Sequence, residues 1–432
     1  MSTKRGSFLF RGGRIYDARR RKFVEADVWV EGDVIRRVGK IGPDEVKAEL
    51  VDAGGWILAP GFIDIHVHLR EPGREDAETI FTGAQAAMAG GFTAVCAMPN
   101  TNPAIDNRGM VEFVRERAEG LLVDVFPIGA VTKGRKGEEL AEMGDMLEAG
   151  AVAFSDDGSP VSNTEILRYA LEYSRMFRVP IIDHCEDPFL SKGRVMNEGR
   201  VSTRLGFAAT PPLAEDLLVI RDIMMAEFTG GHAHIAHISS GRAVELVRQA
   251  KARGVKVTAE ATPHHFCLTD EHVATFDTNL RVNPPLRSEE DRQAVIEGLA
   301  DGTIDAIVTD HAPHTIEEKD VEFDAAAPGL VGLETSVGLA LTELVHKGRL
   351  SLEQLVEKMA LRPRKILGLR VPEIREGEPA NLTFLDPQKE WVVDKTAFKS
   401  RSRNTPFHGW KLRGKAAGVF NHGQLYLAEE NV

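Results

Sequence analysis

Gly61-Phe-Ile-Asp-Ile-His-Val-His-Leu-Arg70 is an apolar, β-branched run that ends in two histidines and an arginine. Such a run predicts a buried strand. Residues two apart on a strand point to the same side, so His66 and His68 project toward one point. Two imidazoles that converge at a strand end can hold a divalent metal such as zinc. An H-x-H pair also occurs on ordinary surfaces and in cores, so the residues around it must decide between a metal site and a structural role.

Seven further strand-like runs follow this one, and helical patterns separate most of them. The eight runs are 62–68, 92–98, 123–131, 152–157, 180–184, 233–239, 255–261 and 304–310. Eight strand–helix repeats predict an α/β protein with a parallel (β/α)₈ TIM-like barrel over residues 57–369. The alternative is a doubly wound open sheet, which is disfavoured because no G-x-G-x-x-G follows the first strand.

Polar residues mark where several of the separating helices begin. The expected starts are at Asn163, at Ser288 with Asp291, and at Ser351 with Gln354. The last two pairs have the spacing of capping boxes. The helical pattern is weaker over 108–119.

The two ends of the chain, 1–56 and 370–432, contain short β-type runs and turns instead of helical patterns. Phe8-Leu-Phe-Arg11 is one such run, and Gly418-Val-Phe-Asn-His-Gly-Gln-Leu-Tyr-Leu427 is another. Neither end alone has enough strands to bury a face. We therefore expect the two ends to pair into one small β-sandwich domain beside the barrel.

The composition is that of an ordinary globular protein, since 43% of the 432 residues are hydrophobic and 27% are charged. The net charge is −12 and no Lys/Arg cluster could follow a phosphate backbone, which argues against nucleic-acid binding. No apolar run approaches the length of a membrane span, and the charged N-terminus lacks the apolar core of a signal peptide. Cys96, Cys185 and Cys267 lie far apart in apolar stretches, which is typical of reduced thiols. We expect a cytoplasmic protein.

Further histidines and aspartates end other predicted strands, namely Asp157, His184, His237 and Asp310. Barrel active sites are built where the carboxyl ends of the strands meet. Buried histidines and aspartates need partners, and shared metal ligation provides them. Six ligands are too many for one open zinc site but suit two metals that share a carboxylate. Such a site activates a bridging water and polarises a carbonyl, which is the chemistry of amide or ester hydrolysis, with Asp310 as the proton carrier.

Other polar residues near these strand ends are candidate substrate contacts: Arg70, Asn100, Asn283 and His314. An arginine beside two cations would be repelled unless an anion lay between them, so Arg70 points to a substrate that bears a carboxylate. Structural alternatives exist for each residue. Arg70 could pair with Glu71 or Asp76, and either asparagine could cap a turn.

Five motifs in this order resemble those of bacterial dihydroorotases of the long type, within the amidohydrolase superfamily. They are His66-Val-His-Leu-Arg-Glu-Pro-Gly73, Met98-Pro-Asn-Thr-Asn-Pro103, Ser155-Asp-Asp-Gly158, Asn283-Pro-Pro-Leu-Arg287 and Asp310-His-Ala-Pro-His314. The resemblance extends from the N-terminal strands to Gly377-Glu-Pro-Ala-Asn-Leu382 and so covers nearly the whole chain.

The resemblance implies two zinc ions per chain, one held by His66, His68 and Asp310 and the other by His184 and His237. A shared aspartate and a hydroxide would bridge them. Asp156 and Asp157 are both available, but strand alternation prevents both from facing the site, and the family's spacing to the next histidine favours Asp157. Related hydantoinases and dihydropyrimidinases have a carboxylated lysine at this position, which this sequence lacks.

The implied substrate contacts are His68, Arg70, Asn100, Asn283, His314 and the backbone of Pro328 and Gly329. Residues 315–327 are charged and rich in small side chains with no clear secondary structure, and in the family this region is a loop over the site.

The implied reaction is the zinc-dependent, reversible cyclisation of N-carbamoyl-L-aspartate to L-dihydroorotate in pyrimidine (UMP) biosynthesis. Two alternatives remain: hydrolysis of another cyclic amide, such as hydantoin, a dihydropyrimidine or allantoin, and a non-catalytic role as a scaffold for aspartate transcarbamoylase. Silent scaffold members are expected to lose metal-binding histidines, and here all the candidate ligands are present. The family resemblance is also compatible with a homodimer and with an active complex with aspartate transcarbamoylase.

Overall fold

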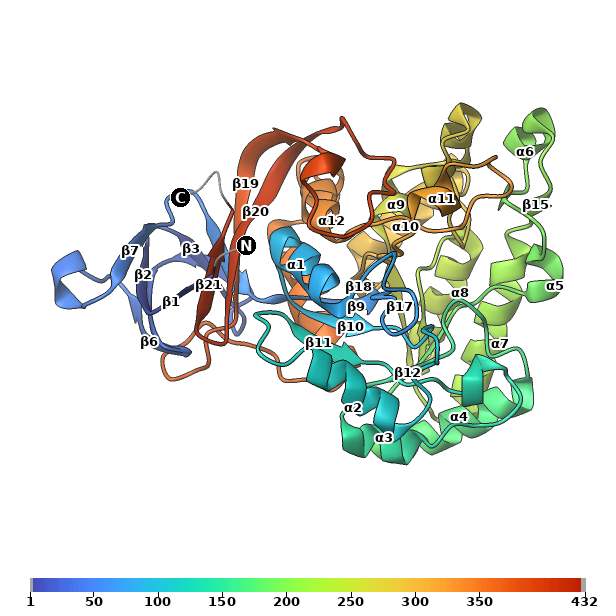
Figure 1. Ribbon diagram of the computed structural model, residues 1–432, viewed down its shortest axis with the longest axis horizontal. Helices are drawn as coiled ribbons and strands as arrows, with labels where there is room; N and C mark the ends of the chain where they lie inside the picture. Colours follow the sequence, from blue (N-terminus) through green and yellow to red (C-terminus); the bar gives the residue numbers. More distant parts are fainter. Residues whose placement is uncertain (1–2, 429–432) are drawn as a thin grey trace.

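Eight parallel strands form a closed barrel at the centre of the molecule, a computed structural model that describes residues 3–428 (Figure 1). The strands are β9 (Phe62–Val67), β10 (Phe92–Ala97), β11 (Asp124–Pro127), β12 (Phe154–Ser155), β13 (Ile181–Asp183), β16 (Ala233–Ile235), β17 (Val257–Ala261) and β18 (Ala306–Ile307). They form one sheet in the order β11-β10-β9 and another in the order β12-β13-β16-β17-β18. Parallel bridges between Gly129 and Phe154 and between Val67 and His311 join the two sheets at both edges. Each strand lies inside one of the eight predicted runs, so the barrel prediction is confirmed.

Helices surround the barrel and bury the outer faces of its strands, which explains why β9 and β10 are apolar and buried along their whole length. The longer helices are α1 (Ile80–Gly90), α2 (Arg108–Arg117), α3 (Met143–Ala149), α4 (Thr164–Phe177), α7 (Leu213–Thr229), α8 (Gly241–Ala252), α10 (Glu289–Asp301) and α12 (Leu333–Ala340). The shorter ones are α5 (Pro188–Ser191), α6 (Arg200–Leu205), α9 (Pro263–Cys267), α11 (Ile316–Lys319), α13 (Leu352–Val356) and α14 (Arg362–Ile366), with π-helical turns at η5 (Leu341–Val345) and η6 (Glu357–Leu361).

The predicted helix starts are confirmed. The Asn163 side chain caps α4, Ser288 caps α10 by accepting from the backbone N–H of Asp291, and Ser351 with Gln354 forms a capping box at α13. The weakly patterned segment also forms a helix, α2, capped by Asn107.

Strands from both ends of the chain form a β-sandwich beside the barrel (Figure 1). One sheet has the order β1-β21-β20-β19-β8-β3-β4 and the other β6-β5-β2-β7. The N-terminal strands are β1 (Lys4–Arg5), β2 (Ser7–Arg11), β3 (Arg14–Asp17), β4 (Lys22–Glu25), β5 (Asp27–Glu31), β6 (Val34–Gly39), β7 (Glu49–Asp52) and β8 (Ile57–Pro60), and the C-terminal ones are β19 (Leu382–Val392), β20 (Lys411–Asn421) and β21 (Gln424–Leu427). Strand β19 pairs with β8, and β1 pairs with β21, so the two ends share one sheet as expected.

The core of the β-sandwich contains buried phenylalanines from both sheets. Phe10 of β2 and Phe384 of β19 lie with ring centroids 4.7 Å apart, and Phe420 of β20 packs against Phe10 at 6.4 Å. The predicted pairing of the chain ends is therefore confirmed. The domain boundaries after residues 56 and 369 stay predictions.

The segment 315–327 begins with a turn of helix, α11. Thr315 and Glu318 form a capping box there, and the Thr315 N–H donates to Glu318 Oε2 at 3.1 Å. No secondary structure was clear for this turn from the sequence, although its T-x-x-E spacing was a cue for a helix start. The buried Lys319 fixes the rest of the loop by donating to the carbonyls of Thr278 and Ala327 at 3.0 and 2.6 Å.

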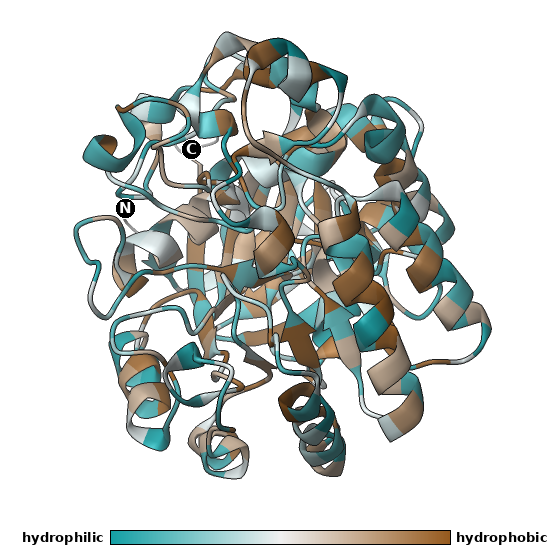
Figure 2. Ribbon diagram, turned by 90° about the vertical axis from the view of Figure 1, so that its right-hand side faces the viewer, coloured by the Kyte–Doolittle hydropathy of each residue, from teal (hydrophilic) through white to brown (hydrophobic). Residues whose placement is uncertain are grey.

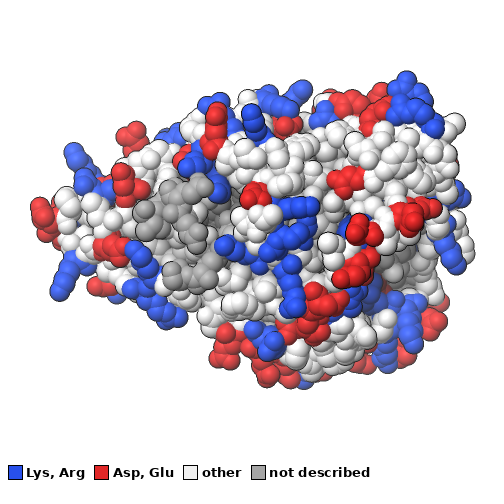
Figure 3. Space-filling view, turned by 45° about the horizontal axis from the view of Figure 1, so that its top comes forward, with Lys and Arg blue, Asp and Glu red and all other residues white. Residues whose placement is uncertain are grey.

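The surface carries charges of both signs. Figure 3 shows lysines and arginines interspersed with aspartates and glutamates over the face that it presents. Within residues 3–428, no helix is long and apolar enough to cross a membrane.

Candidate metal centre

Six side chains from five strands of the barrel meet at its carboxyl end. His66 lies on β9 and His68 directly follows that strand, while Asp157, His184, His237 and Asp310 follow β12, β13, β16 and β18. All six are buried, and none is more than 8% exposed. The strand ends therefore bring together every predicted metal ligand.

The backbone at this face adopts conformations that non-glycine residues rarely take. The φ angles of Arg70, His237 and Asp310 are 61°, 30° and 48°. Positive φ costs free energy for a residue with a Cβ atom, and such positions cluster at functional sites. Here each of them lies two or three residues after a strand of the barrel.

Asp157 lies at the centre of the group. Its Oδ1 is 3.4 Å from His66 Nε2, 3.5 Å from His237 Nε2 and 3.6 Å from His184 Nδ1. Its Oδ2 is 3.4 Å from His68 Nε2. Two ligand sets thus share this one carboxylate: His66 and His68 on one side, and His184 and His237 on the other.

Asp310 lies beside the first of these two sets. Its Oδ1 is 3.0 Å from His68 Nε2 and 3.6 Å from His66 Nε2. A carboxylate in this position can complete the coordination of a metal held by the two histidines, and it can also exchange a proton with a molecule bound next to them.

The separations of 3.4–3.6 Å between Asp157 and the four histidine rings fit a shared metal better than direct hydrogen bonds. Ligands about 2.1 Å from a tetrahedral zinc lie roughly 3.4 Å from each other. Hydrogen bonds from nitrogen to oxygen are shorter, at about 2.9 Å. His66 Nε2, Asp157 Oδ1 and His237 Nδ1 are buried and have no hydrogen-bond partner among residues 3–428. A cation between the rings and the carboxylate would satisfy the first two of these atoms, so the group is a metal site of histidines and aspartates.

The charges of these side chains also indicate a metal site. Burial alone would raise the pKa of Asp157, but the neighbouring rings of His66, His184 and His237 hold it well below its usual range. Burial opposes protonation of the histidines, yet Asp157 and Glu260 raise the pKa of His66 well above its ordinary value, and Asp157 and Glu186 raise that of His184 to about 10. The rings of His66 and His184 therefore favour protons that a bound metal cation would displace.

The neighbouring Asp156 does not face the centre. Its carboxylate accepts hydrogen bonds from the backbone N–H groups of Val131 and Thr132, at 2.9 and 3.1 Å, and from the Thr132 hydroxyl. Arg135 donates to the backbone carbonyls of both aspartates, which holds the turn between them. Of the two aspartates that the sequence offered, only Asp157 lies among the histidines.

A further carboxylate, that of Glu260 on β17, holds the rings of His66 and His234 in place. His66 Nδ1 donates to Glu260 Oε1 at 2.6 Å, and His234 Nε2 donates to Oε2 at 2.9 Å. Burial would raise the pKa of Glu260, but His66 and His234 lower it to about 2. A carboxylate behind a ligating histidine fixes its tautomer and strengthens it as a ligand. Glu260 was not among the predicted site residues, although a glutamate inside the apolar strand Val257–Ala261 was a visible signal.

His264, beside the metal centre, was also not among the predicted site residues. Its imidazole is 1% exposed, and neither ring nitrogen has a hydrogen-bond partner among residues 3–428. Burial lowers its pKa to about 4, and its ring packs against that of His265 at 4.4 Å. The ring is therefore neutral at neutral pH.

Arg70 lies next to the centre without a carboxylate partner. Its Nε donates to the carbonyl of Pro313 at 3.1 Å, and its Nη2 lies 3.4 Å from His314 Nε2. Burial lowers its pKa to about 10. The alternative partners Glu71 and Asp76 instead pair with Arg117 and Arg74. Within residues 3–428 Arg70 forms no ion pair, which leaves its charge available to an anionic ligand.

Of the other predicted substrate contacts, some contact residues of the site directly and one does not. His314 Nε2 lies 2.9 Å from the Pro328 carbonyl, and Gly329 packs against the same ring. Asn100 Oδ1 lies 2.8 Å from His68 Nδ1, so this asparagine also orients a candidate ligand. Asn283 is half-buried, and its side chain makes no hydrogen bond to this group within the described chain. Its loop is tied to the others through Arg281, whose carbonyl accepts from the Gly329 N–H at 2.8 Å.

A residue of the C-terminal segment, Asn404, joins the substrate loops. Its amide nitrogen donates to the carbonyls of Ala312 and Gly329 at 3.0 and 3.2 Å, and its Oδ1 accepts from the His314 N–H at 3.2 Å. The side chain is 5% exposed and uses donors and acceptor together. Nothing in the local sequence around Asn404 indicated this role.

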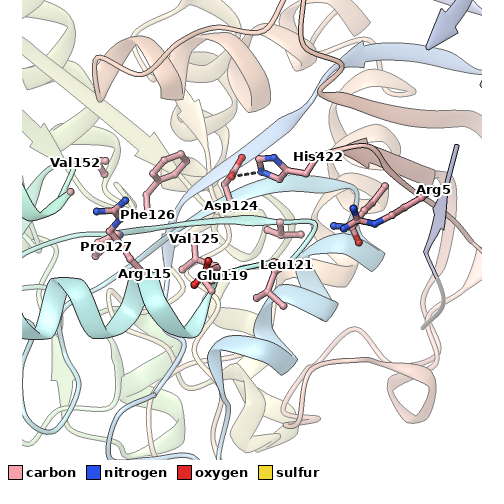
Figure 4. A pocket seen from close by; sticks show the side chains of 15 residues that line it. Arg5, Arg115, Glu119, Leu121, Asp124, Val125, Phe126, Pro127, Val152 and His422 are labelled. Carbon is pink, nitrogen blue, oxygen red and sulfur yellow. Dashed lines mark hydrogen bonds and ion pairs between the residues drawn. The ribbon is translucent and has the colours of Figure 1, made fainter. Parts of the chain in front are cut away.

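Two other features resemble a metal site and a ligand cavity. Asp183, Cys185 and Asp222 lie within 4.8 Å of one another, as metal ligands could. The Arg221 guanidinium, however, lies 2.8 Å from Asp183 and 2.7 Å from Asp222 and already supplies the positive charge there. A cavity of about 650 Å³ lies at the opposite end of the barrel, by the starts of β11 and β12 (Figure 4). Two of its charged groups are paired within the chain, since His422 donates to Asp124 at 2.8 Å and Arg115 to the Ala149 carbonyl at 2.7 Å.

Comparisons with known proteins point to one family. Residues 55–243 match the family described as "Dihydro-orotase-like". A dihydroorotase from Pelotomaculum thermopropionicum is 54% identical over 98% of both chains, and one from Syntrophus aciditrophicus is 50% identical over 98% of this chain and 99% of that one. Among solved structures, L-hydantoinase (dihydropyrimidinase) from Arthrobacter aurescens superimposes with a TM-score of 0.86 at 25% identity, covering 98% of this chain and 96% of that chain. D-hydantoinase (dihydropyrimidinase) from Thermus sp. gives 0.81 at 26% identity, with 98% and 95% covered.

Proposed function

This chain belongs to the dihydroorotase family, and from that premise we propose that it catalyses the reversible cyclisation of N-carbamoyl-L-aspartate to L-dihydroorotate. It is a hydrolase of cyclic amide bonds, and the step belongs to pyrimidine biosynthesis. The choice of substrate depends on Arg70. This residue is a buried cation beside the metal centre and has no carboxylate partner within residues 3–428. An acidic ring or open-chain product would supply the missing carboxylate.

We propose that the centre holds two Zn²⁺ ions. His66, His68 and Asp310 would hold one ion, His184 and His237 the other, and Asp157 would be shared. The ligand separations near 3.4 Å and the unpartnered ring and carboxylate atoms support this assignment. When bound, such a metal pair lowers the pKa of a bound water and polarises the carbonyl that the water attacks.

Asp310 moves the proton in this proposal. Burial would raise its pKa, but His68 and His66 hold it well below its usual range, so the free carboxylate is ionised and can accept a proton at Oδ1. In the hydrolytic direction it takes a proton from the attacking water while the new C–O bond forms. It then delivers that proton to the ring nitrogen as the C–N bond breaks, and ring closure reverses both transfers.

The remaining residues bind and orient the substrate. Arg70 would take its carboxylate, with His314 and the Pro328–Gly329 backbone beside it. Asn100 would contact the substrate while it holds His68, and Asn283 would reach it from the adjoining loop. We also propose a cytoplasmic location, because the three cysteines are all free thiols, as is usual in reducing compartments. We further propose that the chain forms a homodimer and a complex with aspartate transcarbamoylase.

Turnover by the isolated chain tests the function. Dihydroorotate hydrolysis should be lost on chelation and return when zinc is restored. Hydantoin, dihydrouracil and allantoin, assayed side by side, should react far more slowly. Faster turnover of one of these neutral rings would overturn the substrate assignment. A purified chain that is inactive and binds no metal would instead favour a scaffold role.

Arg70→Ala is expected to raise KM for dihydroorotate about 100-fold with a smaller change in kcat. A charge-assisted contact to a carboxylate is worth about 3 kcal/mol, and each 1.4 kcal/mol is a factor of about 10 in affinity. Steady-state kinetics give both constants. Arg108→Ala, which removes an exposed arginine paired with Asp145 and Glu148, is the control and should leave KM unchanged. An unchanged KM in the Arg70 variant would mean that the substrate carboxylate binds elsewhere.

Asn404→Ala is expected to raise KM about 10-fold and to lower the free energy of unfolding by about 2 kcal/mol. The loss of three buried hydrogen bonds frees the loops that carry His314 and Gly329. Asn381→Ala is the matched control, because Asn381 bonds Thr93 and Asn421 at the far end of the barrel. Its free energy of unfolding, measured with denaturant, should fall, but its KM should not change. Equal KM values in the two variants would show that Asn404 supports only the fold.

A further inference from the structure

His264 lies at the end of a barrel strand whose two neighbours both carry residues of the metal centre. It follows strand β17, which lies between β16 and β18 in the sheet, and it belongs to the short helix α9. The neighbouring strand β16 is followed by His237, a candidate metal ligand, and β18 is followed by Asp310, the proposed proton carrier. The order of the strands therefore places His264 between these two residues at the carboxyl end of the barrel.

The ring of His264 is buried without a hydrogen-bond partner, in contrast to the ring beside it. The side chain is 1% exposed, and neither ring nitrogen is bonded within residues 3–428. His265, the next residue on α9, is buried too, but its Nδ1 lies 2.8 Å from Thr262 Oγ1 and its Nε2 lies 3.0 Å from the Pro284 carbonyl. Buried polar groups are nearly always paired. The scaffold uses His265 in this way and leaves both nitrogens of His264 available to a bound molecule.

The imidazole of His264 is neutral and close to the metal centre. Burial lowers its pKa to about 4; Asp310 opposes this shift, while His237 and His66 add to it, so these three side chains lie near the ring. A neutral imidazole offers one N–H donor and one acceptor nitrogen. It can also lie beside metal cations without the repulsion that a lysine or an arginine would meet there.

The interior of the barrel next to this ring is apolar. Its strands form a buried cluster that includes Ile63, Ile65, Ala236 and Val308, and Ala236 directly precedes His237. Figure 2 shows brown, apolar ribbon at the centre of the molecule, with helices around it. A hydrogen bond to a developing charge is strongest where water is excluded and the dielectric constant is low. An N–H donor in this place therefore stabilises such a charge more than it would in water.

The proposed reaction creates a negative charge beside Asp310. In the hydrolytic direction, the carbonyl carbon that water attacks is bonded to the ring nitrogen that Asp310 protonates. The reacting amide must therefore lie next to Asp310, which is near the ring of His264. The carbonyl oxygen gains negative charge as the new C–O bond forms, and a preorganised N–H stabilises that charge. Arg70, Asn100 and His314 are assigned to other parts of the substrate, so this oxygen still needs a donor from the protein.

We propose that His264 is a catalytic residue, which donates an imidazole N–H to the carbonyl oxygen of the scissile amide and stabilises the negative charge that develops there. The assignment rests on the proposed function, because it takes dihydroorotate as the substrate. His264 keeps its proton throughout. The C–O bond that forms, the C–N bond that breaks and the proton that Asp310 carries are unchanged, and in ring closure the same N–H serves the same oxygen.

His264→Phe removes the N–H and keeps a ring of similar size. The loss of one such donor typically costs about 100- to 1,000-fold in turnover, so kcat for dihydroorotate should fall about 100-fold or more. KM should change less than about 3-fold, because the bond strengthens only as charge develops. The free energy of unfolding should stay the same or rise, because an apolar ring replaces a buried polar group without partners. A residue with only a structural role would show the opposite pattern.

Two further variants separate the N–H from the ring and from the helix. His264→Gln supplies an amide N–H, and its kcat should exceed that of His264→Phe by about 10-fold. His265→Phe is the matched control one residue away. It loses two hydrogen bonds to Thr262 and Pro284 and should unfold at lower denaturant concentration, while its kcat changes less than about 3-fold.

Ligand binding to the zinc-loaded chain gives a readout that does not depend on turnover. The two probes for calorimetry are orotate, which has a planar ring and the carboxylate, and a dihydroorotate analogue in which a phosphinic acid replaces the attacked carbonyl. His264→Phe should weaken the phosphinic acid about 100-fold, because that group resembles the charged transition state, and orotate less than about 3-fold.

The outcomes distinguish this role of His264 from the function of the chain. Dihydroorotate turnover by the unmodified chain, together with a near-normal kcat or equal weakening of both probes in His264→Phe, would overturn the role and leave the function standing. Loss of zinc from that variant would also overturn it, because His264 would then be a metal ligand. An unmodified, zinc-loaded chain that neither turns over dihydroorotate nor binds either probe would refute the proposed function, and the role of His264 with it.

Discussion

Replacement of Asp310 by asparagine should reduce kcat for dihydroorotate about 1,000-fold or more while KM changes less than about 10-fold. General acid–base catalysis contributes roughly 100- to 10,000-fold, and an amide cannot accept and release the proton. Asparagine has the shape of aspartate and keeps an oxygen near His68 Nε2, which lies 3.0 Å from Asp310 Oδ1. The variant therefore separates proton transfer from packing better than alanine does.

Steady-state kinetics, together with the metal content of the variant, decide between a lost proton carrier and a lost ligand. A fall in kcat at full metal content supports the proton role. Asp305→Asn is the matched control, because Asp305 lies at the other end of the same barrel segment, paired with Lys251 at 2.5 Å. It should lower stability and leave kcat nearly unchanged. A near-normal kcat in the Asp310 variant would refute the role assigned to this residue.

The sequence predicted the barrel and its metal ligands because both depend on local patterns. Each ligand lies on a short apolar run or within three residues after it, and strand ends in a barrel must converge. His184 and His237 therefore come together without any pattern that links them, and their ring nitrogens lie 2.9 Å apart. The same reasoning identified the β-rich ends as partners, because neither could bury a face alone.

Residues that act across the fold were not predictable in this way. Glu260 reaches His66 from a strand 194 residues away, and Asn404 reaches His314 from the C-terminal segment. Their roles depend on which elements become neighbours in space, and a single sequence does not contain that information. The exposed apolar side chains of helix α7 were missed for a related reason. Apolar residues on both sides of α7 are ordinary for a barrel helix, and only the structure shows which side is left exposed.

The choice between Asp156 and Asp157 depended on the direction of two adjacent side chains, and it leads to the prediction with the largest effect on metal binding. Asp157→Asn should lower the metal affinity more than 100-fold and abolish measurable turnover. Residues that only support a ligand already cost about 10- to 100-fold when lost. Asp157 is central to both ligand sets, with four histidine nitrogens within 3.6 Å of its carboxylate, so both metals should be affected.

Asp156→Asn provides the control one residue away. Its carboxylate accepts from the backbone N–H groups of Val131 and Thr132 and from the Thr132 hydroxyl, so the variant should unfold at lower denaturant concentration. It should still bind metal as the unmodified chain does, because Asp156 faces away from the histidines. Metal content after dialysis at neutral pH, measured by mass spectrometry, compares the two variants directly. Metal loss in Asp156→Asn with retention in Asp157→Asn would reverse the assignment. Equal loss in both would mean that the Asp156–Asp157 turn, and not the shared carboxylate, governs the site.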